Sequence, residues 1–141
     1  MFKNVLLPID LNHDASWQKA LPVAKQMAGP GGRIHLLGIV HDLGAAMVAA
    51  YLPEGFEKAA MERLKADLKA FADAQMPGSE NVEVHVGHGH VPETILRTAS
   101  HVKADAIVMA SHPPHELQTL LIGSNADKVV RHSEVTVVVV R

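Results

Sequence analysis

Short apolar runs alternate along this chain with longer segments of mixed polarity. Four of the runs are apolar on both faces, as strands buried on both sides are: residues 4–10, 33–40, 104–110 and 135–140. A fifth run, over residues 81–89, alternates valines with polar residues. That alternation predicts a strand with one less buried face, as at the edge of a sheet. We therefore expect five strands.

The segments between these runs are interpreted as helices, over residues 17–28, 54–75, 91–102 and 125–132. Asp14 or Ser16 can cap the first helix, and Pro22 inside it either kinks the helix or shifts its start. Regular alternation of strand and helix predicts an α/β fold, a single doubly wound domain over residues 1–141 with helices on both faces of a parallel sheet. Residues 41–55 show no clear period, and their path is left open.

Composition and charge exclude several classes of function. The chain has 13 Lys+Arg against 15 Asp+Glu, a net charge of −2 with His neutral, so no basic surface for nucleic acid is expected. The absence of cysteine excludes disulfides, thiolate catalysis and Cys-based metal centres. No run of about 18 apolar residues can span a bilayer, and the N-terminus turns acidic too soon for a signal peptide. We expect a cytoplasmic protein without membrane contacts.

Candidate binding residues follow the predicted strands, because doubly wound sheets bind ligands at the carboxyl ends of their strands. Asp10 ends the first strand, and its carboxylate can accept hydrogen bonds from a ribose or adenine, or from the first turn of the next helix. We expect the backbone N–H groups of Gly123, Ser124 and Asn125 to be unpaired in the first turn of the last helix, where together with the helix dipole they make an anion site. The same Gly-Ser pair can equally be an ordinary N-cap.

The chain resembles the universal stress protein family over nearly its entire length, in the segments NVLLPID, IHLLGIV, GHVPETIL, ADAIVMASH and LLIGSNADKVVRHSEVTVVVVR. The last segment is the most specific, because GS-x-A-x-KV-x-RH before a Val-rich strand is close to the family's closing pattern. The resemblance implies a Rossmann-like sheet of five parallel strands in the order 3-2-1-4-5. It also implies a homodimer and a stress-response or sensor module, which in many members binds ATP without fast turnover.

The family's nucleotide-binding signature is G-x-x-G, nine residues, and then G-S or G-T. In this frame Ala110 and Pro113 replace the two leading glycines, while Gly123 and Ser124 keep the second half. By resemblance, Asp10 contacts the adenosine, the backbone of residue 39 faces the adenine ring, and the Gly-Ser pair holds phosphates. The candidate cofactor-binding residues are therefore Ile9, Asp10, Ile39, Met109, Ala110, His112, Gly123, Ser124 and Asn125.

The two replacements leave the ligand open. Pro113 removes an N–H donor and fixes φ near about −65°, so this loop cannot wrap a triphosphate along the same backbone path. His112 and His115 can supply side-chain donors instead, which preserves a variant site for ATP, AMP or another adenine nucleotide, with or without magnesium. Alternatively, ATP binding is lost and the protein is a dimeric interaction or signalling protein.

Catalysis has little support in the sequence. Neither a nucleophile elbow nor a Walker lysine after a Gly-rich loop is present, so we expect no enzyme. A slow nucleotide hydrolase, with His112 as acid or donor, is a further alternative.

Ten histidines are present, and two pairs have the spacing of metal ligands. His88 and His90 follow the third strand, and His112 and His115 follow the fourth. In the implied strand order those two strands are three spacings apart, roughly 14 Å, too far to share one ion. We interpret these histidines as exposed or locally hydrogen-bonded and expect no metal site.

The last strand, over residues 135–140, has no following helix to cover its far edge. An apolar edge of this kind pairs with another chain unless it is protected. We therefore expect a two-fold homodimer through this strand, as in the family it resembles. The alternative is a strand that is simply buried between helices.

Overall fold

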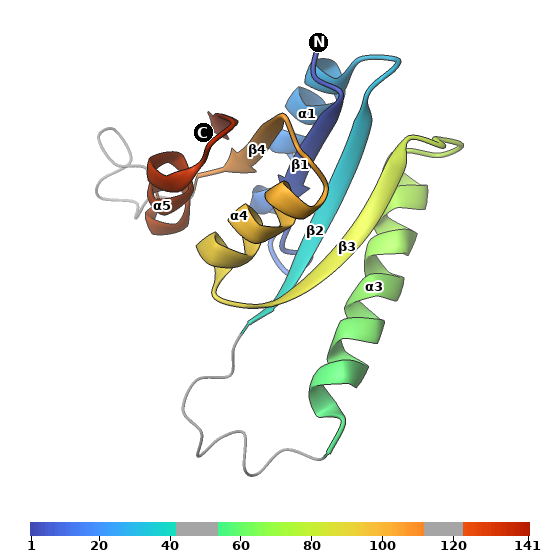
Figure 1. The fold of residues 1–141 in the computed structure, drawn as a ribbon. Helices are drawn as coiled ribbons and strands as arrows, with labels where there is room; N and C mark the ends of the chain where they lie inside the picture. Colours follow the sequence, from blue (N-terminus) through green and yellow to red (C-terminus); the bar gives the residue numbers. More distant parts are fainter. Residues whose placement is uncertain (42–53, 112–122) are drawn as a thin grey trace.

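The computed structural model describes residues 1–41, 54–111 and 123–141, and it shows one parallel sheet between two layers of helices (Figure 1). The strands are β1 (Asn4–Pro8), β2 (Arg33–His41), β3 (Val82–Gly89), β4 (Ala106–Ala110) and β5 (Thr136–Val140). Their order is β3-β2-β1-β4-β5, and all four neighbouring pairs are parallel. The predicted fold class and strand order are confirmed.

Helices cover both faces of this sheet, in two pairs. Helices α1 (Ala20–Ala28) and α3 (Phe56–Gln75) lie on one face, and α4 (Val91–His101) and α5 (Ser124–His132) lie on the other (Figure 1). Each face of the sheet has its own hydrophobic core, and alternate residues of β1 contribute to both. Leu7 packs in the core beneath α1 and α3, and Leu6 packs in the core beneath α4 and α5. Burying a leucine side chain contributes about 1.5–3 kcal/mol, so these central strands anchor both layers. None of the described helices is long and apolar enough to cross a membrane.

The start of α1 differs from the sequence prediction. Residues 14–16 form a separate 3₁₀ helix, η1 (Asp14–Ser16), and α1 begins only at Ala20. No side chain caps either helix, so the expected caps at Asp14 and Ser16 are wrong. The reason is that the Ser16 hydroxyl is bonded to the backbone of Asp10. Pro22 is the third residue of α1, where N–H groups have no helical acceptor; of its two expected effects, the shifted start is the one observed.

Close contacts between backbone segments seal the amino end of the sheet. The carboxylate of Asp105, just before β4, accepts hydrogen bonds from the N–H groups of Lys3 at 2.8 Å and Asn4 at 2.9 Å. Burial by itself raises the pKa of Asp105, but these hydrogen bonds hold that pKa below its usual value of 3.8. Beside them, Gly32 lies so close to the carbonyls of Ala28 and Phe2 that a Cβ would fall 2.2 and 2.7 Å from their oxygens.

The two edge strands are β3 and β5. The edge position predicted for β3 is confirmed, but the burial of its residues does not alternate: all of them are half-buried apart from the exposed Glu83. In β5, Thr136 is exposed and the valines are half-buried. The carbonyl of Val140 accepts a hydrogen bond from the Ser111 N–H at 2.9 Å, so β5 is tied to the end of β4.

Candidate functional site

A cavity of about 640 Å³ lies at the carboxyl end of the sheet, beside the ends of β1 and β4. Strand β1 is paired with β2 on one side and with β4 on the other, so the strand order reverses here. Such a reversal leaves a crevice, because the connections on its two sides run to opposite faces. The strands and α5 contribute Pro8, Ile9, Asp10, Ile39, Val40, Met109, Ala110, Gly123, Ser124, Asn125 and Ala126 to its lining.

Asp10 extends β1 into this cavity. Its carboxylate accepts a hydrogen bond from the Asn12 N–H at 2.9 Å and lies 2.9 Å from Nδ1 of His13. The Ser16 hydroxyl accepts from the Asp10 N–H and donates to its carbonyl, both at 2.9 Å. These bonds fix the turn between β1 and η1; the backbone donor is Asn12, which precedes η1, so the expected bond from the first turn of the next helix is not the one formed. Its side chain is still 43% exposed, which leaves carboxylate lone pairs accessible to a ligand.

The backbone of Ile39 faces the same space. The carbonyl of Leu37 in β2 accepts a hydrogen bond from the Ile9 N–H at 2.9 Å, just past the end of β1. Backbone groups two residues apart on a strand point to the same side, so the N–H and C=O of Ile39 point beyond the end of β1. This arrangement suits a flat heterocycle that offers one donor and one acceptor along an edge.

The amino end of α5 forms the opposite side of the cavity. Gly123 is the N-cap, and the helix begins at Ser124, one residue earlier than expected. The Gly123 N–H donates to the Ser111 hydroxyl at 3.0 Å, so the expectation that this amide is unpaired is wrong. The N–H groups of Ser124, Asn125 and Ala126 have no acceptor within the helix, and the helix dipole adds positive potential there.

Helix α3 supplies a side of the cavity that the sequence analysis missed. Phe56, Ala59, Ala60, Arg63, Leu64 and Asp67 line it, at the spacing of one helical face. The same spacing was visible in the sequence, where Arg63 and Asp67 flank the apolar stripe. The sequence does not show that this face of α3 extends beyond the carboxyl end of the sheet, as it does in Figure 1. Val91 and Ile95 of α4, with Leu11, Asn12 and Ser16, complete the lining.

The structure therefore brings eight of the nine candidate residues around one cavity. The ninth, His112, lies outside the described residues, as do Pro113 and His115. Of the other histidine pair, His88 lies 3.3 Å from an oxygen of Glu57, and His90 is exposed before α4. Both fit the interpretation of exposed or locally bonded side chains.

Comparisons with known proteins agree with these observations. The whole chain, residues 1–141, matches the Universal stress protein family. It is 30% identical over 149 residues to universal stress protein G of Escherichia coli O157:H7, and the match covers 100% of both chains. The solved structure of hypothetical protein MJ0577 aligns with a TM-score of 0.77 and 23% identity, covering 99% of this chain and 96% of that one.

A universal stress protein solved in complex with cAMP also aligns, with a TM-score of 0.61, 21% identity, and coverage of 99% of this chain and 97% of the other. At these identities the structural matches establish the fold alone. The match of the whole sequence to the family goes further and agrees with the motifs quoted above. This chain belongs to the universal stress protein family.

Proposed function

We propose that this protein is a stress-response or sensor module of the cytoplasm that binds an adenine nucleotide in the cavity at the carboxyl end of its sheet. The observation that carries the proposal is the convergence of three kinds of polar group on one cavity. The carboxylate of Asp10 would accept from the ribose or adenine, and the backbone of Ile39 would pair with the adenine edge. The amides at the start of α5 would bind phosphate.

The charges around the cavity favour a nucleotide with few phosphates. Among the described residues that line it, Arg63 is a cation, and Asp10 and Asp67 are anions. Repulsion by the two carboxylates opposes a triphosphate more than a monophosphate or a cyclic phosphate. The related structure solved with cAMP supports the same class of ligand. We therefore expect AMP or cAMP to bind more tightly than ATP, and magnesium to reduce the difference.

Calorimetry on the native protein with AMP, cAMP, ADP and ATP, each with and without magnesium, tests this proposal. We expect micromolar binding of AMP or cAMP, and a loss of about tenfold or more in the Asp10→Ala variant, because a hydrogen bond to a charged group contributes about 1.5–3 kcal/mol. Asp14→Ala is the matched control, since Asp14 is an exposed carboxylate in η1 outside the cavity lining. If none of the four nucleotides binds, the alternative of an interaction or signalling protein replaces this one.

We propose that the bound nucleotide is held and not turned over. The slow-hydrolase alternative depends on His112, a residue outside the described part of the chain. Phosphate release from ATP by the native protein decides between them. Turnover that disappears in His112→Ala would establish the hydrolase.

We also propose a homodimer through β5. The valines of β5, and Val135 just before it, are half-buried although β5 lies at the edge of the sheet, and they pack toward both cores. An unpaired edge of this kind is completed by the same strand of a second copy. Sedimentation should show a dimer for the native chain and a monomer for Val138→Lys. Val84→Lys in the other edge strand is the matched control, because Val84 is equally half-buried against the same core and should leave the dimer intact. A monomeric native protein would refute the proposal.

A further inference from the structure

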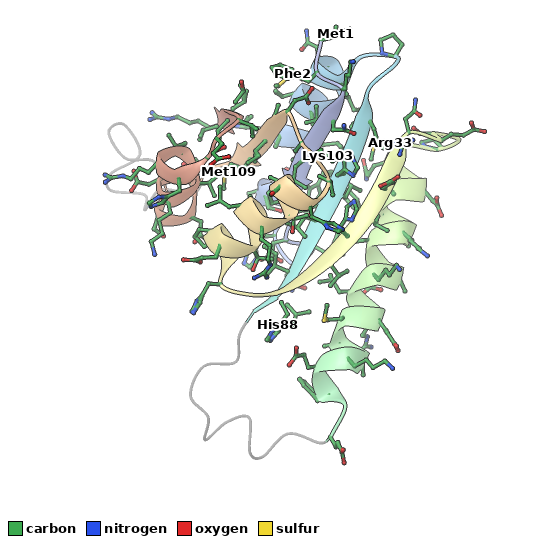
Figure 2. The ribbon with its side chains drawn as sticks, viewed as in Figure 1. Met1, Phe2, Arg33, His88, Lys103 and Met109 are labelled. Carbon is green, nitrogen blue, oxygen red and sulfur yellow. The ribbon has the colours of Figure 1, made fainter. Side chains whose placement is uncertain are left out.

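Three side chains with metal-binding chemistry meet at the other end of the sheet, away from the cavity. His35 of β2 is paired in register with Glu83 of β3, and His85 follows two residues later on the same face of β3. Their potential ligand atoms all lie within 4.8 Å of one another. In Figure 2, Arg33 marks the amino end of β2, where the cluster lies, and His88 marks the opposite, carboxyl end of β3.

The distances within this cluster match the geometry of a small divalent ion. Nδ1 of His35 lies 2.9 Å from Nε2 of His85 and 3.5 Å from Oε2 of Glu83, and the two latter atoms are 3.7 Å apart. Zinc bonds of about 2.0–2.1 Å in a tetrahedron place neighbouring ligand atoms about 3.3–3.4 Å apart. An ion can therefore be accommodated by shifts of a few tenths of an ångström in these side chains.

Neighbouring residues already orient two of the three potential ligands. Nε2 of His35 is hydrogen-bonded to Oδ1 of Asn4 at 3.1 Å, so its proton sits on Nε2, and Nδ1 accepts a hydrogen bond from Nε2–H of His85 at 2.9 Å. Zinc would take the place of that shared proton, which would be released on binding. One oxygen of Glu83 accepts from Arg33 at 2.6 Å, which turns the other oxygen toward the two imidazoles. Partners of this kind fix the tautomer and the direction of metal ligands in known sites.

We infer that His35, Glu83 and His85 bind a zinc ion, with a fourth position taken by water. Two imidazoles and one carboxylate are a ligand set that suits Zn²⁺ and excludes Mg²⁺, which prefers oxygen alone. The exposed fractions of the His35, Glu83 and His85 side chains are 5%, 45% and 24%, so an ion can enter from the solvent side of β3. Bound there, zinc would tie the edge strand β3 to β2.

This site is independent of the proposed nucleotide site. His35 and Ile39 are four residues apart on β2, which places them about 13 Å apart along the strand. Zinc should therefore leave nucleotide affinity unchanged, and the failure of either proposal leaves the other standing.

The test is calorimetric titration of the metal-stripped, full-length protein with ZnCl₂, together with the visible spectrum of the Co²⁺-substituted protein. We expect one tight site, a spectrum typical of four-coordinate Co²⁺, and no heat with MgCl₂. Glu83→Gln and His85→Gln should each weaken zinc binding by about tenfold or more, by analogy with the cost of disturbing known sites. His88→Gln is the matched control on the same strand, and it should bind zinc as the native protein does.

Glu83→Gln is the primary variant because its side chain is the most exposed of the three and its amide is nearly isosteric, which keeps the fold intact. Circular dichroism confirms folding before each titration. The inference is wrong if the native protein lacks a tight site, or if Glu83→Gln and His85→Gln bind zinc as tightly as His88→Gln does. A rise in melting temperature with ZnCl₂ that is lost in Glu83→Gln would support it further.

Discussion

An aspartate lies at each end of the sheet, and the two differ in how their carboxylates are bonded. At the amino end, both carboxylate oxygens of Asp105 accept hydrogen bonds from backbone N–H groups, those of Lys3 and Asn4 at the start of β1, and Gly32 permits close backbone contact. At the carboxyl end, Asp10 fixes its own turn but keeps 43% of its side chain exposed, next to a cavity of about 640 Å³. The carboxylate of Asp105 is used by the fold, and that of Asp10 stays accessible.

The difference follows from how backbone groups are satisfied at each end. Strands β1 and β4 begin level with each other, so the chain itself supplies partners for Asp105. Strand β1 ends before β2 does, and α5 begins with amides that have no acceptor in the helix. Donors and acceptors without a partner in the secondary structure therefore collect at the carboxyl end, where water or a polar ligand can bind them.

The largest expected effect is at the sealed end. Gly32→Ala places a methyl group 2.2 Å from the backbone oxygen of Ala28 at the end of α1 and 2.7 Å from that of Phe2, and backbone atoms cannot yield as the end of a flexible side chain can. We expect a loss of about 3 kcal/mol or more in the free energy of unfolding, measured by urea denaturation. Gly31→Ala is the control, because nothing lies within 4 Å of its Cβ position and the variant should match the native protein. Equal stability of the two variants would contradict close packing at this end.

The second effect concerns the carboxylate that closes the fold. Asp105→Ala leaves the N–H groups of Lys3 and Asn4 without their acceptors. We expect a loss of about 1–3 kcal/mol in unfolding free energy, and unchanged nucleotide affinity. Weaker nucleotide binding in this variant would mean that the two ends of the sheet are energetically coupled, whereas we expect them to be independent.

The third effect is at Asp10, where we expect a small loss of stability and a large loss of nucleotide affinity. Asp10→Ala should cost about 1 kcal/mol or less in stability, because the bonds of this carboxylate are to an exposed amide and an exposed imidazole. The same variant should lose most of the proposed nucleotide affinity. A stability loss as large as that of Asp105→Ala would show that Asp10, too, is primarily structural.

The smallest effect is a pH dependence of stability at the histidine cluster. Burial lowers the pKa of His35 below 6.5, and the neighbouring His85 lowers it further, while Glu83 raises it and Arg33 opposes Glu83. Burial likewise lowers the pKa of His85, Glu83 raises it, and His101 and Lys65 lower it.

Because the folded state resists protonation of both rings, the unfolded state takes up protons first as the pH falls below 6.5. In buffer with EDTA, the contribution of these rings to the free energy of unfolding should be constant above pH 6.5 and should decrease as the pH falls below 6.5. His85→Gln should reduce this slope, and His88→Gln should keep it. A flat profile in the native protein would mean that the rings are not shielded.

Much of the fold could be predicted because its signals are local. Uninterrupted apolar runs identified the central strands, and alternating valines identified β3 as an edge. The start of α1 could not be predicted, because the Ser16 hydroxyl can either cap a helix or bond to the backbone of Asp10. Which bond forms depends on where β1 ends, and the sequence does not give the distance between Ser16 and the end of β1.

The sequence predicted only those residues of the candidate site whose place follows from the topology of the sheet. Residues after strand ends, such as Asp10, follow from the rule for doubly wound sheets. Arg63 was missed because its place depends on how far α3 extends past the sheet. The cluster of His35, Glu83 and His85 was missed for a different reason: its members are up to 50 residues apart, and only the register of β2 against β3 joins them.

The bond between the Ser111 hydroxyl and the Gly123 amide has a consequence for the mechanics of the fold. It joins the end of β4 to the N-cap of α5 directly, although eleven residues separate the two in the sequence. The N–H group of the same serine donates to the carbonyl of Val140 at the end of β5. One side chain and one amide of a single residue therefore join two strands and a helix.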